Sequence, residues 1–183
     1  MKGKRIILTG ASGVGKTTLA EPLSKQLGLP VIPELGRDIC RQLGYERIGD
    51  IPNQEAFKNS VLDAQIQTED KLGNFISDRS TIDCWVLWQR WNICQAMSYD
   101  TETYYNKTRK QSEKYTHIIF VPPMFPPEED GFRWTDADYQ KQIDRITRMT
   151  LYEWQLLDKT YFVTGKSVDN RLQEITDWLR GKA

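Results

Sequence analysis

Residues 10–18 of this 183-residue chain read Gly-Ala-Ser-Gly-Val-Gly-Lys-Thr-Thr and fit the pattern GxxxxGK[ST]. They lie between a short apolar run, Arg5 to Thr9, and a helix-forming stretch that begins near Lys16. Glycines let the backbone curl so that successive N–H groups point inward, and the following helix adds the positive end of its dipole. The stretch therefore predicts a P-loop, a turn that binds nucleotide phosphates. The alternative, a glycine-rich turn without a ligand, does not explain this placement between strand and helix.

The P-loop motif assigns a role to each of its residues. Lys16 is expected to reach the β- and γ-phosphates, and the Thr17 hydroxyl is expected to hold Mg²⁺. The predicted nucleotide contacts in the loop are Gly10, Ser12, Gly13, Val14, Gly15, Lys16, Thr17 and Thr18.

Apolar runs alternate with helical segments along the chain, which is typical of a parallel sheet with helices on both faces. The predicted strands are Arg5–Thr9, Leu29–Pro33, Asn74–Ser77, Thr116–Val121 and Thr160–Thr164. The predicted helices cover residues 16–27, 36–43, 53–72, 81–97, 101–114, 136–159 and 171–179. The length is enough for one domain and not comfortably enough for two, so we predict a single α/β domain over residues 1–183.

The charge balance bears on the class of partner. Lysine plus arginine and aspartate plus glutamate each number 25, so the formal net charge is zero. Proteins that bind nucleic-acid backbones usually carry a basic excess, because phosphate neutralisation supplies most of their affinity. The balance argues against a polynucleotide partner, although a local basic patch remains compatible with it.

The cysteines and the N-terminus indicate an ordinary reduced protein. Cys40, Cys84 and Cys94 have no CxxC spacing. We interpret Cys84 and Cys94, which lie in a predicted helix, as small, mostly buried thiols. The N-terminus has no signal-peptide core, and no stretch approaches the length of a membrane span. We expect a cytoplasmic protein without a membrane partner.

A P-loop by itself does not separate kinases from other nucleotide-binding proteins. A GTPase is expected to show an Asn-Lys-x-Asp motif, and the chain has none. The chain is also too short for an AAA machine with its helical lid domain. Small-molecule kinases have the size and layout that remain.

Further short motifs follow the P-loop in order along nearly the whole chain. They are Pro33-Glu34-Leu35-Gly36-Arg37, Ser77-Asp78-Arg79-Ser80-Thr81-Ile82-Asp83, Asp130-Gly131-Phe132-Arg133 and Thr164-Gly165-Lys166. With the P-loop, they resemble the P-loop nucleoside and nucleotide kinase group, and most closely the small AAA-like ATPase/kinase family that includes ribosylnicotinamide kinase domains. The resemblance implies a three-layer P-loop NTPase fold with strand order 2-3-1-4-5, and ATP and Mg²⁺ as cofactors.

Glu34 lies just after the second predicted strand. In deoxynucleoside kinases, which the chain resembles, a carboxylate at this point accepts the proton of the attacking hydroxyl. The competing interpretation is an acidic residue that stabilises the dipole of the helix from Gly36. Arg37, three residues on, is placed to pair with Glu34 or to bind an anion of the substrate.

The motif after the third strand supplies three more candidates. Asp78 is expected to contact Mg²⁺ or its water shell, because the fourth strand, THIIFV, ends in prolines without a Walker B aspartate. By the resemblance, Arg79 orients the acceptor or pairs with Glu34. Asp83 is a candidate for holding a polar group of a sugar or base, and a solvated or capping acid is the alternative.

Residues 122–135, rich in proline and acid, form a candidate lid. The resemblance implies that Arg133 bridges phosphate oxygens when the lid closes and excludes water. Glu128, Glu129 and Asp130 depart from the basic lids of such kinases, which weakens any claim that the lid binds a highly anionic acceptor.

The remaining candidates lie beyond the lid or on the Trp-rich helix. Arg145 and Arg148 continue a basic stripe that either binds substrate or forms a solvated face. Gly165 lies where such kinases usually hold adenine with backbone contacts, and ATP is the default by family. Trp85, Trp88 and Trp91 pack in the core, unless one of them stacks on a base.

We therefore predict an ATP- and Mg²⁺-dependent phosphotransferase that acts on a nucleoside, a nucleotide or a related metabolite. The predicted catalytic residues are Lys16, Glu34, Arg79 and Arg133. One alternative is an ATPase or regulatory ATP-binding module without a small-molecule acceptor, and another is a kinase acting on nucleic acid. The sequence does not indicate an oligomeric state.

Overall fold

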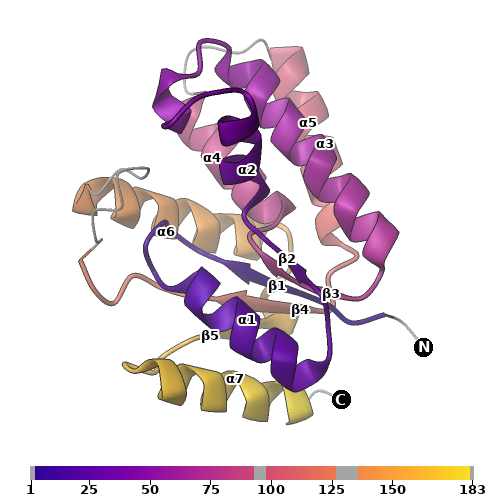
Figure 1. The fold of residues 1–183 in the computed structure, drawn as a ribbon, viewed down its shortest axis with the longest axis vertical. Helices are drawn as coiled ribbons and strands as arrows, with labels where there is room; N and C mark the ends of the chain where they lie inside the picture. The colour runs from indigo at the N-terminus through magenta and orange to yellow at the C-terminus, as the bar shows by residue number, and fades with distance from the viewer. Residues whose placement is uncertain (1–2, 93–97, 127–135, 182–183) are drawn as a thin grey trace.

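The short apolar segments of the chain pair as one parallel sheet (Figure 1). The computed structural model describes residues 3–92, 98–126 and 136–181. The strands are β1 (Arg5–Thr9), β2 (Val31–Ile32), β3 (Phe75–Asp78), β4 (His117–Phe120) and β5 (Thr160–Phe162). They lie in the order β2-β3-β1-β4-β5, which confirms the predicted order.

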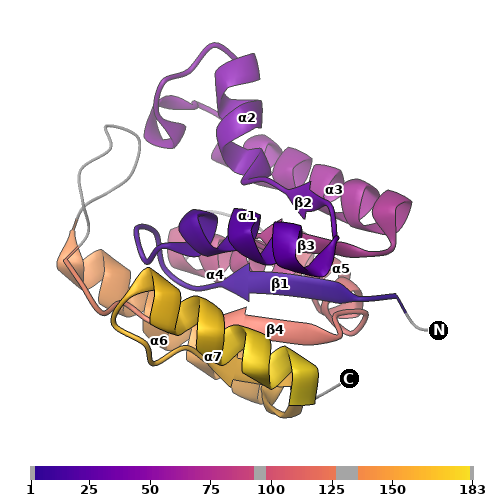
Figure 2. The same ribbon diagram turned by 60° about the horizontal axis from the view of Figure 1, so that its bottom comes forward.

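Helices cover both faces of the sheet, as predicted. The α-helices of the described ranges are α1 (Lys16–Leu27), α2 (Leu35–Gln42), α3 (Gln54–Leu72), α4 (Thr81–Trp91), α5 (Ser98–Ser112), α6 (Ala137–Glu153) and α7 (Val168–Gly181). Figures 1 and 2 show α1 and α7 together on one face and α4 to α6 on the other, while α2 and α3 rise beyond the β2 edge. Two short 3₁₀ turns, Ile48–Asp50 and Leu157–Lys159, complete the described structure.

The strand register determines where polar side chains can gather. Leu8 of β1 pairs with Asp78 of β3, and Thr9 pairs with Phe120 of β4. Because all pairings are parallel, the carboxyl ends of these strands meet at one edge of the sheet. That edge is where open α/β sheets bind their ligands.

The core explains why the strands are continuous apolar runs. Ile6, Ile7 and Leu8 of β1 are buried, as expected for a strand covered on both faces. The interpretation of the Trp-rich helix as core is confirmed for Trp85, which stacks on Trp154, and for Trp88, which stacks on Tyr104. The predicted burial of Cys84 is also confirmed, and the structure buries Cys40 as well.

Element boundaries differ from the prediction mainly at helix ends. The long helix predicted to reach residue 159 ends at Glu153, and α7 begins at Val168 rather than at Arg171. Side-chain caps that accept backbone N–H groups lie at the starts of several helices, at Asn53, Ser80, Asp136 and Ser167. In the part of the chain that is described, no helix combines the length and the apolar character needed to cross a membrane.

Candidate nucleotide and acceptor site

The loop between β1 and α1 has the curled backbone that its glycines predict. Gly10, Gly13 and Gly15 have φ angles of 136°, 76° and 91°, a region that glycine enters without steric cost. A Cβ atom on Gly10 would lie 2.4 Å from the carbonyl oxygen of Val121, which follows β4. The glycine therefore allows a close approach of the loop to β4, and α1 begins behind the loop at Lys16.

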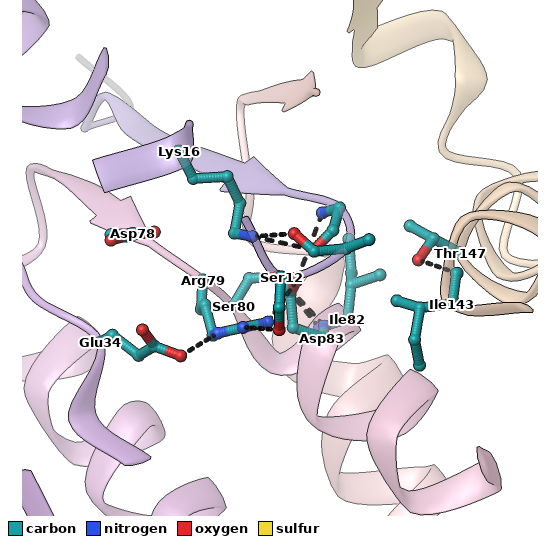
Figure 3. Close-up of polar contacts among 12 residues, drawn as sticks. Ser12, Lys16, Glu34, Asp78, Arg79, Ser80, Ile82, Asp83, Ile143 and Thr147 are labelled. Carbon is teal, nitrogen blue, oxygen red and sulfur yellow. Dashed lines mark hydrogen bonds and ion pairs between the residues drawn. The ribbon is translucent and has the colours of Figure 1, made fainter. Parts of the chain in front are cut away.

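Lys16 lies inside this loop and is 5% exposed. Its Nζ donates to the carbonyl oxygens of Gly10 at 2.9 Å and of Ala11 at 2.6 Å (Figure 3). Burial, helped by the nearby charge of Arg79, lowers the pKa of Lys16 to about 8, and surrounding carboxylates only partly oppose this. The ammonium is thus held on the loop. Nearby carboxylates balance its charge only in part, so it can attract an anionic phosphate.

Thr17 and Asp78 form a direct pair at the edge of the sheet. The Thr17 hydroxyl donates to Asp78 Oδ2 at 2.5 Å. The pairing follows from the register, because β3 ends at Asp78 beside β1. Hydroxyl and carboxylate oxygens are the hard ligands that Mg²⁺ prefers. The two residues predicted to bind the metal therefore lie together, in an arrangement that fits the ion.

Arg79 joins three elements of the site. Its Nε donates to Glu34 Oε1 at 2.7 Å, its Nη2 donates to Ser12 Oγ at 3.1 Å, and its Nη1 lies 3.5 Å from Asp83 Oδ1 (Figure 3). Its backbone has a φ of 93°, a strained conformation for a residue with a side chain that costs about 1–3 kcal/mol. Such strain persists only where the surroundings enforce it, and here the three contacts hold the guanidinium across the P-loop.

The electrostatics of Arg79 follow from these contacts. Burial disfavours its charged form, but the carboxylates of Glu34 and Asp83 outweigh burial and raise the pKa of Arg79. The residue is therefore a permanent cation at the junction of the P-loop, the end of β2 and the start of α4.

Glu34 points toward the P-loop and not along its own helix. It occupies the N-cap position of α2 but makes no side-chain cap bond. Its carboxylate pairs with Arg79 and, at 3.8 Å, with Nε of Arg37. Both predicted pairings of Glu34 are thus present in the structure, and the role of Glu34 in proton transfer stays a prediction.

Asp83 fastens the P-loop to α4. It is 4% exposed, accepts a hydrogen bond from Ser80 Oγ at 2.8 Å, and lies 3.4 Å from the backbone nitrogen of Gly10, which donates to it. Burial raises the pKa of Asp83, and the charges of Arg79 and Lys16 oppose that shift. The carboxylate is engaged within the protein and is not solvated, so its predicted contact with the substrate would have to compete with these bonds.

The two arginines of α6 make other contacts or face solvent. Arg148 donates to Asp144 at 2.9 Å, and its Cζ lies 4.6 Å from the ring centroid of Phe120. Arg145 is exposed. Among the described residues, neither forms a hydrogen bond or ion pair with the P-loop, Glu34 or Arg79. Arg133 and residues 127–135 of the candidate lid lie outside the described residues.

A cleft of about 360 Å³ opens beside the P-loop, and Glu34 is not among the residues that line it. Besides the loop and the start of α1, its lining consists of Phe125, Pro126, Lys166, Val168 and Arg171. The cleft lies next to Gly165, the residue predicted to lie near adenine, because Arg171 connects the two loops. The arrangement provides room for the rest of a nucleotide whose phosphates lie in the P-loop.

Arg171 is a site residue that the sequence analysis missed. Its Nη1 donates to the carbonyl oxygen of Val14 at 3.0 Å and its Nε to that of Gly165 at 2.8 Å, and the side chain is nearly buried. The sequence signal was an arginine one turn into a helix, where the dipole disfavours a cation. Gln140 of α6 is a second residue that the sequence did not point to. Its side-chain amide donates to the carbonyl oxygen of Ser12 at 3.0 Å.

A buried polar network supports the segment that carries Asp78 and Arg79. Glu69 of α3 is fully buried and accepts hydrogen bonds from Gln65 at 2.8 Å, Gln111 at 2.9 Å and Tyr115 at 2.9 Å. The network reaches both ends of that segment through Ser77 and Thr81. Burial raises the pKa of Glu69, and its hydrogen bonds oppose the shift.

Helix α3 buries two polar residues together with apolar ones. The structure buries Phe57, Leu62, Gln65 and Glu69. The two polar residues lie inward because partners from neighbouring elements satisfy them there. Ser77 of β3 accepts a hydrogen bond from Gln65, while Gln111 of α5 and Tyr115, in the turn before β4, donate to Glu69.

Together, the strand order, the P-loop at the end of β1 and the charged residues at the ends of β2 and β3 define the P-loop fold of nucleoside and nucleotide kinases. The sequence model of a family described as AAA domain (AAA_28) matches residues 5–171. The chain belongs to this family, in agreement with the resemblance seen in its motifs.

Solved structures share the fold. The NadR protein in complex with NR superposes with a TM-score of 0.81 at 19% identity, covering 99% of this chain and 52% of that chain. Thymidylate kinase from Candida albicans gives 0.69 at 14% identity and coverages of 98% and 92%. Deoxyadenosine kinase from M. mycoides with bound dATP gives 0.61 at 15% identity and coverages of 96% and 98%.

One curated relative matches locally. The erythromycin resistance ATP-binding protein MsrA of Staphylococcus epidermidis is 46% identical over 50 residues, which make up 27% of this chain and 10% of MsrA. The chain thus spans a tenth of this relative and about half of the NadR chain.

Proposed function

We propose that this protein transfers the γ-phosphoryl group of ATP to a small acceptor, a nucleoside, a nucleotide or a related metabolite, and that it requires Mg²⁺. The observation that carries the proposal is the chain of contacts from Glu34 through Arg79 to Ser12 of the P-loop. It holds a carboxylate beside the place where the terminal phosphate of a P-loop nucleotide lies, which is where an acceptor hydroxyl must lose its proton.

On the donor side, the chain supplies positioning and charge. Backbone N–H groups of residues 10–15 and the N-terminus of α1 face the phosphates. Lys16 exchanges its bonds to the carbonyls of Gly10 and Ala11 for the phosphate oxygens. Thr17 and Asp78 are the residues that would hold Mg²⁺. When bound, that ion neutralises charge on the phosphate oxygens.

On the acceptor side, Glu34 accepts the proton of the attacking hydroxyl. Its pairing with Arg79 lets a carboxylate lie close to the anionic nucleotide, because the guanidinium offsets the repulsion between them. Arg79, held across the P-loop, also stabilises negative charge on the transferring group. Arg37 and Arg133 are proposed to bind anionic groups of the reactants, the latter when the lid of residues 122–135 closes.

The named neighbours support a small acceptor. Two of them are called deoxyadenosine kinase and thymidylate kinase, and a third was solved in complex with NR. These names concern nucleoside-type molecules, and none concerns a polymer. The balanced charge of this chain supports the same choice over a nucleic-acid kinase.

The test is ATP consumption measured against a panel of nucleosides, nucleoside monophosphates and sugars, with Lys16→Ala as the inactive control. We expect at least one acceptor to raise consumption well above the rate without acceptor, and the phosphorylated product to appear in equal amount. Consumption that stays at the basal rate with every compound would instead support the ATPase or regulatory alternative.

A further inference from the structure

Arg90, in the last turn of α4, carries a buried donor that no group satisfies. Its Nε is buried and has no hydrogen-bond partner within the described ranges. Its guanidinium forms no ion pair among the described residues and instead lies over the ring of Tyr139 in α6, with 5.5 Å between Cζ and the ring centroid. A cation near a helix C-terminus suits the helix dipole. That benefit needs no burial, so it does not explain an orphaned donor.

Other arginines of the chain show how unusual this is. Arg79 is buried and satisfied by three partners. Arg109 also stacks on a tyrosine, Tyr105, but it is exposed and donates to the tyrosine hydroxyl at 3.3 Å. The other buried, unsatisfied side-chain atoms of the described residues belong to neutral groups. The Arg90 side chain as a whole is half-buried, and Nε is its one atom among the buried, unsatisfied ones of the described residues. Buried donors are almost always paired in folded proteins, so an unpaired one on a charged side chain favours a ligand.

Arg90 lies on the same helix as Asp83, a residue of the site. It lies seven residues, or two helical turns, after Asp83, so the two side chains share a face of α4 about 10 Å apart along its axis. Asp83 contacts the P-loop and Arg79. Helix α6 packs against α4, as Figures 1 and 2 show. Burial raises the pKa of Tyr139, and the charges of both Arg79 and Arg90 lower it, so both guanidinium groups lie near this hydroxyl.

We propose that Arg90 binds an anionic group of the acceptor, a phosphate or a carboxylate, and that the acceptor is therefore a negatively charged metabolite of the nucleotide type and not a neutral nucleoside. Nε and one Nη of an arginine form a fork that matches two oxygens of either group. The Tyr139 ring packs against the guanidinium, and Nε has no partner among the described residues. This inference rests on the proposed phosphotransferase function and specifies its substrate class.

The test compares matched acceptors with and without the anion. Uridine is paired with uridine 5′-monophosphate, which adds a phosphate, and with orotidine, which adds a carboxylate to the base; adenosine and its monophosphate form a further pair. We expect the wild type to prefer a charged member, and the identity of that member tells phosphate from carboxylate. Arg90→Gln should raise KM for that member by about 10- to 100-fold, the range expected for a lost charge-assisted hydrogen bond, and leave KM for the neutral partner unchanged.

Two variants keep the result interpretable. Arg109→Gln removes an arginine stacked on a tyrosine elsewhere in the fold and should change neither KM. Arg90→Lys keeps a cation but loses the fork, so its KM for the charged member should lie between those of wild type and Arg90→Gln. If Arg90→Gln does not fold, as judged by its thermal unfolding midpoint, Arg90→Lys takes its place. The lysine variant should then raise KM for the charged acceptor and leave KM for the neutral one unchanged.

A binding measurement separates this inference from the proposed function. With the nucleotide site filled by AMP-PNP, each compound is titrated calorimetrically into wild type and variants. If no compound is phosphorylated, the proposed function fails, and binding of a charged compound that Arg90→Gln weakens still supports the anion subsite. The subsite is overturned if neutral and charged partners bind alike, if Arg90→Gln weakens both equally, or if no charged compound binds.

Discussion

The two halves of the site are built in different ways. The phosphate side is one continuous stretch, residues 10–18, in which glycines shape the backbone and backbone groups face the ligand. The proposed acceptor side is assembled from side chains of separate elements: Glu34 before α2, Arg79 after β3, Arg90 on α4 and Tyr139 on α6. Backbone recognition tolerates little change of sequence, whereas a set of side chains can be replaced one at a time. The first half thus identifies the donor, and the second decides the acceptor.

The largest effect is expected when the acceptor side alone is broken. Glu34→Gln removes the proton acceptor and half of the ion pair with Arg79, so acceptor-dependent turnover should fall by about 10²- to 10⁴-fold. ATP affinity and the slow hydrolysis without acceptor should stay close to wild type, since both depend on the P-loop. Steady-state kinetics with and without acceptor, together with nucleotide titration, measure this. Equal losses in both activities would show that the halves do not act separately.

Breaking the backbone of the phosphate side should destabilise the fold itself. Gly10→Ala places a Cβ atom 2.4 Å from the carbonyl oxygen of Val121 at a φ of 136°, and we expect a loss of about 3 kcal/mol in the free energy of unfolding. Gly28→Ala is the matched control, since its φ of 64° is also positive but no atom lies within 4 Å of the added Cβ. It should cost about 1–2 kcal/mol. Urea denaturation that gives the same loss for both would contradict the close approach of the loop to β4.

The polar network beneath the acceptor side should contribute somewhat less. Glu69→Leu leaves the donors of Gln65, Gln111 and Tyr115 without their shared acceptor, and we expect a loss of about 2 kcal/mol, since one buried unsatisfied group costs about 1–3 kcal/mol. Glu102→Leu, at an exposed glutamate of α5, should change the unfolding free energy by under about 0.5 kcal/mol. Chemical denaturation measures both, and a silent Glu69→Leu would contradict the network.

The smallest expected effect is the number of protons that the phosphate side takes up when a nucleotide binds. With a pKa of about 8, Lys16 is largely charged at pH 7 and largely neutral at pH 9 in the free protein. Bound phosphates favour the charged form and raise this pKa, so nucleotide binding should take up close to one proton at pH 9 and almost none at pH 7. Calorimetry in buffers of different ionisation enthalpy measures the uptake. Lys16→Ala should abolish it, and an unchanged uptake in that variant would assign the proton to another group.

Lys16 also has a defined effect on stability. Its pKa in the folded protein lies below the ordinary value of 10.5, so the unfolded chain binds more protons between these values. The contribution of Lys16 to the free energy of unfolding therefore rises as pH increases from about 8 toward 10.5. Below pH 8, where both states hold the proton, its burial carries its full cost.

Much of the fold was predictable because its signals are local. The run Arg5 to Thr9 is apolar since both faces of β1 are buried, and its position before the glycines places the P-loop at a strand end. Helix α1 begins and ends at the predicted residues, Lys16 and Leu27, with Gly28 in the left-handed conformation as its C-cap. The charged residues that follow the second and third predicted strands, Glu34, Asp78 and Arg79, could also be recognised in the sequence.

What the sequence alone determined is therefore the phosphate side: a contiguous loop has its geometry set by its own glycines, whatever lies around it. Tertiary structure alone decided which distant side chains meet. Arg79 reaches both Ser12 and Glu34 because β3 lies between β1 and β2 and its backbone turns at a positive φ. Tertiary packing also brings Arg171 between the P-loop and the Gly165 loop. It leaves the Nε of Arg90 buried and without a partner among the described residues. Burial and pairing depend on the whole packed chain, and no stretch of sequence carries that information.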